Sequence, residues 1–138
     1  MRLSTPQRIL LADDDTSLRL GVADLLSGLG LEVLQAETGP EAVKIGTSAA
    51  IHAALLDRHM PGCTGLEVIP QLRATHLELP CLVYSGDLTE PLVRAAEQAG
   101  AMAVLPKPVD PQLLRREVLR ALGHNVSGDQ ITGDPPSA

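Results

Sequence analysis

Three consecutive carboxylates, Asp13, Asp14 and Asp15, directly follow an apolar run near the start of the chain. Like charges on neighbouring residues repel one another, so the rest of the protein must supply something that makes them tolerable. A hard divalent cation with oxygen ligands is the natural remedy, and Mg²⁺ or Mn²⁺ is the expected ion. A fourth carboxylate, Asp57, ends a second apolar run and becomes a further ligand if the fold brings the two runs together.

Two further polar side chains follow later apolar runs. Ser85 stands in LVYSG and Lys107 in VLPKPV. Taken singly, they are an ordinary turn serine and a solvated lysine, just as Asp13 and Asp14 taken singly are helix caps. At one edge of a sheet, however, a cation, a hydroxyl and an ammonium are the groups that stabilise a phosphoryl group during its transfer.

Five apolar runs are typical of buried strands, at residues 8–12, 31–36, 53–57, 81–85 and 102–105. Nearly continuous apolar character suits the central strands of a parallel sheet. The second run carries Glu32 and Gln35, which suits a strand at the edge of the sheet.

The segments between these runs have helical patterns. Apolar residues between 18 and 29 recur with helical spacing, and Gly30 is expected to end that helix. Asp15, Thr38 and Asp110 are expected to begin the first, second and fifth helices. Pro70 falls inside the third, at residues 65–74, so this helix is expected to be kinked or to begin late.

Alternation of strands and helices predicts a doubly wound α/β fold. Ligands of such sheets bind beyond the carboxyl ends of the strands, at the point where the strand order reverses. With the order 2-1-3-4-5 the first and third strands are neighbours, so Asp13, Asp14 and Asp57 would share one crevice. Residues 7–123 form the predicted domain, with a flexible N-terminus at 1–6 and a disordered tail or linker at 124–138.

Length and composition limit the function further. The 138 residues suit one domain, and 44% of them are apolar although Tyr84 is the sole aromatic residue. A net charge of −6 argues against nucleic-acid binding. The sequence contains neither a run of about 18 apolar residues nor a signal peptide, so no membrane contact and a cytoplasmic location are expected. Two cysteines, Cys63 and Cys81, are expected to be reduced thiols.

With these motifs in order, the sequence resembles the receiver domain of bacterial two-component response regulators. The resemblance rests on ILLADDD, on LLDRHMPGCTG with its Met-Pro and Gly, on VYSG and on LPKP, and it covers about residues 7–123. It implies a flavodoxin-like (βα)₅ fold with a five-stranded parallel sheet.

The resemblance also implies a role for each site residue. Asp57 is the phosphoacceptor that attacks a donor phosphohistidine. Asp14 and Asp57 hold the metal directly, Asp13 holds it through water, and the backbone carbonyl of His59 completes the site. Ser85 binds a phosphoryl oxygen.

Lys107 pairs with the phosphate, and its peptide bond to Pro108 is usually cis in this family. The chain would catalyse its own phosphorylation and dephosphorylation without being an enzyme toward other substrates. Its expected partners are a sensor histidine kinase or phosphotransfer protein and, downstream, an effector protein or a fused output domain. Phosphorylation is expected to move Ser85 and the loop that follows it, and to repack the fourth helix, the fifth strand and the fifth helix.

One position departs from the family pattern. Val104 stands where the family usually has an aromatic residue, so we expect signalling mainly through the Ser85 loop and not through a swinging ring. Tyr84 should point to the opposite face of the sheet from Ser85 and is interpreted as a packing residue. His59 and Asp87 are either exposed loop residues or flank the path of the attacking water.

Two other classes of protein share parts of this pattern. A haloacid-dehalogenase-type phosphatase would use Asp13 as its nucleophile, but it also needs an acidic pair after Lys107, and it leaves Asp57 without a role. A flavin-binding module of the same topology conflicts with an acidic crevice and with the lack of aromatic stacking partners. The remaining histidines, His52, His76 and His124, have no ligand spacing.

Overall fold

The structure, a computed structural model, describes residues 6–123. The predicted tail at 124–138, with His124, and all of the predicted N-terminal segment except Pro6 lie outside the described residues. Strands and helices alternate, as β1 (Arg8–Ala12), α1 (Thr16–Ser27), β2 (Glu32–Ala36), α2 (Gly39–Ser48), β3 (Ala53–Asp57), α3 (Gly65–Arg73), β4 (Cys81–Ser85), α4 (Glu90–Ala99), β5 (Ala103–Pro106) and α5 (Pro111–Ala121).

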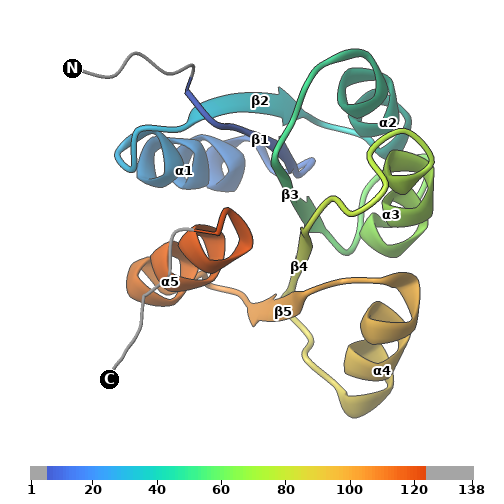
Figure 1. The fold of residues 1–138 in the computed structure, drawn as a ribbon. Helices are drawn as coiled ribbons and strands as arrows, with labels where there is room; N and C mark the ends of the chain where they lie inside the picture. Colours follow the sequence, from blue (N-terminus) through green and yellow to red (C-terminus); the bar gives the residue numbers. More distant parts are fainter. Residues whose placement is uncertain (1–5, 124–138) are drawn as a thin grey trace, which may run out of the picture.

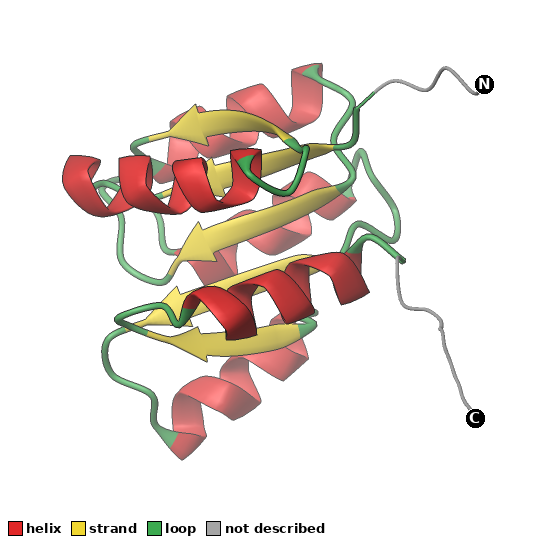
Figure 2. Ribbon diagram, turned by 90° about the vertical axis from the view of Figure 1, so that its left-hand side faces the viewer, coloured by secondary structure: helices red, strands yellow, loops and turns green. Residues whose placement is uncertain are grey.

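The five strands form one parallel sheet in the order β2-β1-β3-β4-β5, which confirms the predicted fold. All five arrowheads in Figure 2 point the same way, so the carboxyl ends share one edge. The register aligns the site at that edge. Ala12 pairs with Leu56, so Asp13 and Asp57 follow at one level, and Ser85 pairs with Pro106, directly before Lys107.

Helices cover both faces of the sheet. Figure 1 shows α1 and α5 on one side and α2, α3 and α4 on the other. Alternate strand residues point to opposite faces, so each strand supplies both layers. The result is two separate apolar cores, one on each face.

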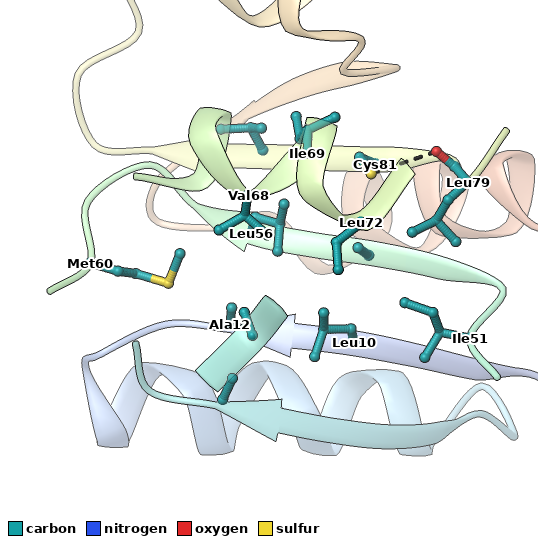
Figure 3. Close-up of a cluster of buried hydrophobic side chains, with 14 residues drawn as sticks. Leu10, Ala12, Ile51, Leu56, Met60, Val68, Ile69, Leu72, Leu79 and Cys81 are labelled. Carbon is teal, nitrogen blue, oxygen red and sulfur yellow. Dashed lines mark hydrogen bonds between the residues drawn. The ribbon is translucent and has the colours of Figure 1, made fainter. Parts of the chain in front are cut away.

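The core under α2 and α3 is aliphatic apart from Met60 and Cys81. Figure 3 shows its side chains, with Leu10, Leu56 and Leu72 in the middle. The core under α1 and α5 is also mostly aliphatic, but it contains Tyr84, which is completely buried. Both thiols of the chain are free, as predicted.

A side-chain oxygen caps the start of every helix, from Asp15, Thr38, Thr64, Thr89 and Asp110 in turn. Each of these oxygens accepts a backbone N–H that has no partner within the first turn. The three starts predicted from sequence, at Asp15, Thr38 and Asp110, are confirmed.

The structure corrects the predicted end of the first helix and excludes one of the two alternatives for the third, the late start, while the alternative of a kink at Pro70 stays a prediction. The first helix ends at Ser27, and Gly30 adopts its positive φ of 84° in the turn beyond it. The third helix begins at Gly65 and does not begin late, although Pro70 lies inside it. Thr64 and Glu67 form a reciprocal capping box at its start, which helps to offset the hydrogen bond that Pro70 removes.

Among residues 6–123, no helix combines the length and the apolar character needed to cross a bilayer.

Candidate functional site

Three carboxylates meet at the carboxyl end of the sheet. Oxygens of Asp13, Asp14 and Asp57 all lie within 4.8 Å of one another. Asp13 and Asp57 are 0% and 4% exposed, whereas Asp14 is open to solvent. Three clustered carboxylates are a donor set suited to a hard divalent cation, and the open side at Asp14 gives such an ion a way in. The three carboxylates are therefore clustered as predicted, and we call their surroundings the acidic pocket.

Asp57 ends β3 with its carboxylate facing Lys107. The Lys107 ammonium donates to Oδ1 of Asp57 over 3.0 Å, and the backbone N–H of His59 approaches the same oxygen at 3.4 Å. Burial raises the pKa of Asp57 to about 6; the hydrogen bond from Lys107 opposes the rise, and the neighbouring Asp13 adds to it. Without a cation, the surroundings of this carboxylate thus disfavour its charged form.

Asp13 is held from several sides. Its Oδ1 accepts the backbone N–H of Asp15 over 2.9 Å, and its Oδ2 accepts the hydroxyl of Tyr84. Lys107 lies 3.6 Å from the same Oδ2. Behind it, the buried guanidinium of Arg19 donates to the backbone carbonyl of Asp13 over 2.9 Å. Both carboxylate oxygens are therefore engaged before any ligand arrives.

Tyr84 has a larger role than the sequence suggested. Its side chain does lie on the opposite face from Ser85, in the core under α1 and α5, as the alternation predicted. The interpretation as a packing residue was incomplete, because its hydroxyl reaches the acidic pocket and donates to Asp13. Burial together with this hydrogen bond raises the pKa of Tyr84 far above its usual range, so the phenol keeps its proton. The Lys107 ammonium lies 4.6 Å from the centre of its ring.

Ser85 is buried and ends β4 beside the pocket. Its hydroxyl oxygen accepts the backbone N–H of Asp87 over 3.1 Å, which makes a tight turn after the strand. The interpretation as a turn serine thus describes its contacts, and the residue also ends β4 at the same edge of the sheet as the three carboxylates. The N–H of Lys107 donates to the Ser85 carbonyl over 2.9 Å, and the Lys107–Pro108 peptide bond is cis.

Lys107 itself is not a solvated lysine, because its side chain is only 21% exposed and contacts both Asp57 and Asp13. Asp13 and Asp14 are also not helix caps, since Asp15 alone caps α1. All five of the predicted side chains, Asp13, Asp14, Asp57, Ser85 and Lys107, therefore gather at one end of the sheet.

Gly65, the first residue of α3, packs directly behind Asp57. A Cβ atom at this position would lie 2.4 Å from the backbone carbonyl oxygen of Asp57. The N–H of Gly65 also donates to the carbonyl of Arg58 over 3.0 Å. Only glycine allows this approach, so the glycine at the end of the MPGCTG motif is explained by contact with the main chain of the predicted acceptor.

The model of the response regulator receiver domain matches residues 9–119. The chain belongs to this family. Proteins similar to it in sequence include the response regulator MprA of Mycolicibacterium vanbaalenii, 38% identical over 94% of this chain. The sensory/regulatory protein RpfC of Xanthomonas campestris is 37% identical over 74% of this chain.

Solved receiver structures have the same fold. A CheY-like receiver domain protein of Methanospirillum hungatei superposes with a TM-score of 0.81 at 26% identity, covering 87% of this chain and 96% of that one. The receiver domain of the sensor histidine kinase PA1611 of Pseudomonas aeruginosa, described with a magnesium ion in its active-site cleft, has a TM-score of 0.79 at 25% identity and covers 86% and 99%.

The curated relatives are longer than this receiver. It spans 55% of the length of MprA and 15% of the length of RpfC. The family assignment therefore applies to this domain and does not extend to the activities of the longer relatives.

Four residues discussed from the sequence lie outside the group of five site side chains. Val104 is half-buried in β5, and no ring occupies its position. His52 accepts the N–H of Arg8, and His76 contacts the carbonyl of Gly46, so both are structural. His59 is exposed, and its carbonyl as a metal ligand stays a prediction.

Sequence reasoning missed Arg19 and the hydroxyl of Tyr84. Arg19 stands in a helical pattern of leucines as an ordinary charge, and its burial depends on the carbonyl of Asp13 and on Gln35, to which it also donates. A sequence signal for Tyr84 did exist. A lone tyrosine immediately before the site serine, at the carboxyl end of a strand, places a long polar side chain beside the acids.

Proposed function

We propose that this receiver domain takes a phosphoryl group from a histidine kinase or a phosphotransfer protein onto Asp57. The observation that carries the proposal is the contact of the Asp57 carboxylate with Lys107 inside a cluster of three carboxylates. An ammonium at this distance can follow the oxygen that acquires the phosphoryl group and stabilise its charge. Family membership makes this chemistry the first expectation for the site.

A divalent cation, Mg²⁺ or Mn²⁺, is proposed as the cofactor. Asp14 and Asp57 would hold it directly, Asp13 would hold it through water, and the carbonyl of His59 would complete the site. The mutual approach of the three carboxylates supports this assignment, and so does the magnesium described for the PA1611 receiver. When bound, the cation neutralises charge on the transferred group and on the acids.

In the proposed reaction an Asp57 oxygen attacks the phosphorus of a phosphohistidine. The new P–O bond forms as the P–N bond breaks, and the imidazole leaves with the electron pair. Asp57 must be ionised to attack, and Lys107 favours that form. Lys107 and the Ser85 hydroxyl then hold the phosphoryl oxygens, until attack by water returns phosphate and the free carboxylate. In this proposal the chain catalyses its own phosphorylation and its own dephosphorylation.

The output is proposed to begin at Ser85. An oxygen of a phosphoryl group at Asp57 would compete with the backbone carbonyl of Asp87 for the proton of the Ser85 hydroxyl, which would release the turn at residues 86–89 and bias the face formed by α4, β5 and α5. Since Val104 replaces the usual ring, we expect the loop to respond more than β5. The receiver would act in the cytoplasm on an effector protein or on a fused output domain.

The phosphatase alternative assigns the nucleophile to Asp13. That carboxylate is fully buried, and both of its oxygens accept hydrogen bonds, so it is poorly placed to attack phosphorus. Asp57 is also only 4% exposed, but its contacts with Lys107 and with the N–H of His59 both involve Oδ1. The engagement of both Asp13 oxygens therefore favours Asp57 as the acceptor.

The acceptor assignment is tested by incubating the protein with Mg²⁺ and a small-molecule phosphoryl donor, followed by mass spectrometry of the intact chain and its peptides. We expect one phosphoryl group on the wild type and none on Asp57→Asn. Asp24→Asn is the matched control, because Asp24 is an exposed carboxylate on α1. Phosphorylation of the Asp57→Asn protein at Asp13 would instead support the phosphatase alternative.

A further inference from the structure

We propose that Tyr84 is a positioning residue of the phosphoryl-transfer site and determines which of two carboxylates forms the ion pair with Lys107. Its hydroxyl donates a hydrogen bond to Asp13 and its ring lies beside the Lys107 ammonium, so the lysine stays paired with Asp57. The inference rests on the proposed function, since it assigns Tyr84 a part in that reaction.

The first support is the burial and reach of the side chain. Tyr84 is 0% exposed and is the only aromatic residue of the chain. Its side chain belongs to the core under α1 and α5, and its hydroxyl donates to Oδ2 of Asp13. The N–H of Asp15 holds the other oxygen, Oδ1. Asp13 is therefore fixed in orientation at both oxygens.

The second support is the unequal sharing of Lys107. Two carboxylates of like charge compete for one ammonium, yet Lys107 lies 3.0 Å from Asp57 and 3.6 Å from Asp13. The Asp13 oxygen that faces the lysine is the one that already accepts the tyrosine hydroxyl. A carboxylate oxygen with a strong donor in place attracts a second donor less, so the lysine forms its short contact with Asp57.

The third support is the ring of Tyr84. The Lys107 ammonium lies 4.6 Å from the ring centre, within the range in which a cation is attracted to an aromatic face. The ring thus limits the positions that the Lys107 ammonium can take. The hydroxyl acts on the same ammonium indirectly, because it makes Asp13 a weaker partner for it.

Removal of the hydroxyl should redistribute these contacts. Tyr84→Phe keeps the ring and nearly all of the volume, but it leaves Oδ2 of Asp13 with Lys107 as its nearest donor. Lys107 should then shift from Asp57 toward Asp13. We expect the rate of phosphoryl acceptance from a small-molecule donor to fall about tenfold, the size typical of losing a partner that orients a site residue.

Magnesium affinity gives a readout that does not depend on phosphorylation. A carboxylate paired with lysine is a weaker metal ligand. Tyr84→Phe should move Lys107 from Asp57, a proposed direct ligand, to Asp13, which would hold the ion through water, so calorimetric titration with Mg²⁺ alone should show binding to Tyr84→Phe about tenfold tighter than to the wild type. Tyrosine fluorescence gives a second readout, because Tyr84 is the only tyrosine and the chain has no tryptophan. The emission of Tyr84 should change on addition of Mg²⁺ and in the Asp13→Asn variant, but not in the Asp24→Asn variant.

Leu82→Val is the matched control for disturbed packing. Leu82 lies two residues before Tyr84 on the same strand and in the same apolar core. It should lose some stability to urea while keeping the wild-type rate and the wild-type affinity for Mg²⁺.

The outcomes separate the two proposals. Tyr84→Phe with a rate and a Mg²⁺ affinity within about twofold of the wild type would overturn the role of Tyr84, because such changes are smaller than those expected for a lost orienting partner. A wild type that takes up no phosphoryl group would overturn the proposed function, and the magnesium titration would then decide on Tyr84 by itself.

Discussion

The layer of α1 and α5 differs from the layer of α2, α3 and α4 in one respect: its apolar core is connected to the acidic pocket. Tyr84 belongs to that core and donates to Asp13, and Arg19 of α1 holds the carbonyl of the same residue. The core under α2 and α3 consists of aliphatic side chains with Met60 and Cys81 (Figure 3). One layer therefore carries polar contacts into the site, and the other packs against the sheet without them.

This difference indicates that one helical layer contributes mainly to the free energy of unfolding, while the other also orients the polar groups of the pocket. Substitutions in the core under α2 and α3 should change the free energy of unfolding and leave the pocket as it is. Substitutions of the polar residues under α1 should change the pocket even where the free energy of unfolding changes little.

The largest expected effect is that of Leu72→Ala in α3. Leu72 is completely buried in the apolar core, and its truncation leaves a cavity that should cost about 2–5 kcal/mol of unfolding free energy. Urea unfolding measures this loss. The folded protein should accept phosphoryl groups at the wild-type rate. A large fall in that rate would show that this layer also controls the pocket.

Asp57→Asn should have the next largest effect, at the boundary between the layers. The folded protein raises the pKa of Asp57 to about 6. The stability that this shift contributes is present below about pH 4 and is lost as the pH rises through 6, because the native state gives up its proton late. Without metal at neutral pH, the neutral asparagine should therefore raise the unfolding free energy by about 1–3 kcal/mol.

The pH dependence of that gain checks its cause. Urea unfolding of both proteins should show little difference near pH 4 and a difference that grows up to about pH 7. Mg²⁺ should stabilise the wild type and narrow the gap, since it binds the native carboxylates. A gap that is independent of pH would contradict the assigned shift.

Gly46→Ala tests how tightly the apolar layer is packed. A Cβ atom on this residue of α2 would lie 2.3 Å from a methyl carbon of Leu72 and 3.2 Å from one of Leu10. Both side chains must shift, so we expect a loss of about 1–3 kcal/mol in spite of the better helix propensity of alanine. Thermal unfolding measures it, and a gain in stability would show that this core has spare room.

Gly21→Ala is the counterpart on the other layer and has the smallest expected effect. Gly21 lies inside α1 and is exposed, and a Cβ atom added to it would have no neighbouring atom within 4 Å. Alanine should therefore stabilise the protein by about 0.5–1 kcal/mol through helix propensity alone. A loss on thermal unfolding would indicate that the outer surface of α1 is covered in solution.

Much of the fold could be predicted because its signals are local. Each strand is a short apolar run, and each predicted cap is a polar side chain at the correct spacing from the helix. No local signal gives the strand order 2-1-3-4-5, which is one of the common orders of doubly wound folds and places Asp13 beside Asp57. Pro70 shows the limit of such reasoning, since a capping box and a buried helix face outweigh one missing hydrogen bond.

The polar contacts behind the pocket could not be predicted in the same way. Alternation along β4 places Tyr84 on the face opposite Ser85, but it does not say how far a long side chain extends beyond the end of the strand. The helical spacing of the apolar residues between 18 and 29 includes Leu25, and it gives no reason to expect that Arg19 is buried. In the structure Leu25 is exposed. Arg19 is buried, because its guanidinium donates a hydrogen bond to the backbone carbonyl of Asp13.

The close packing of Gly65 against Asp57 has a consequence for the direction in which a signal travels. The loop between β3 and α3 is anchored twice, by Gly65 to the carbonyl of Arg58 and by its Pro61 carbonyl to the start of α2. Beyond β4, by contrast, Gly86 has open space around it. The main chain behind Asp57 thus has no room to recoil from the proposed phosphoryl group, and in that proposal the displacement would pass across the pocket into the segment that follows Ser85.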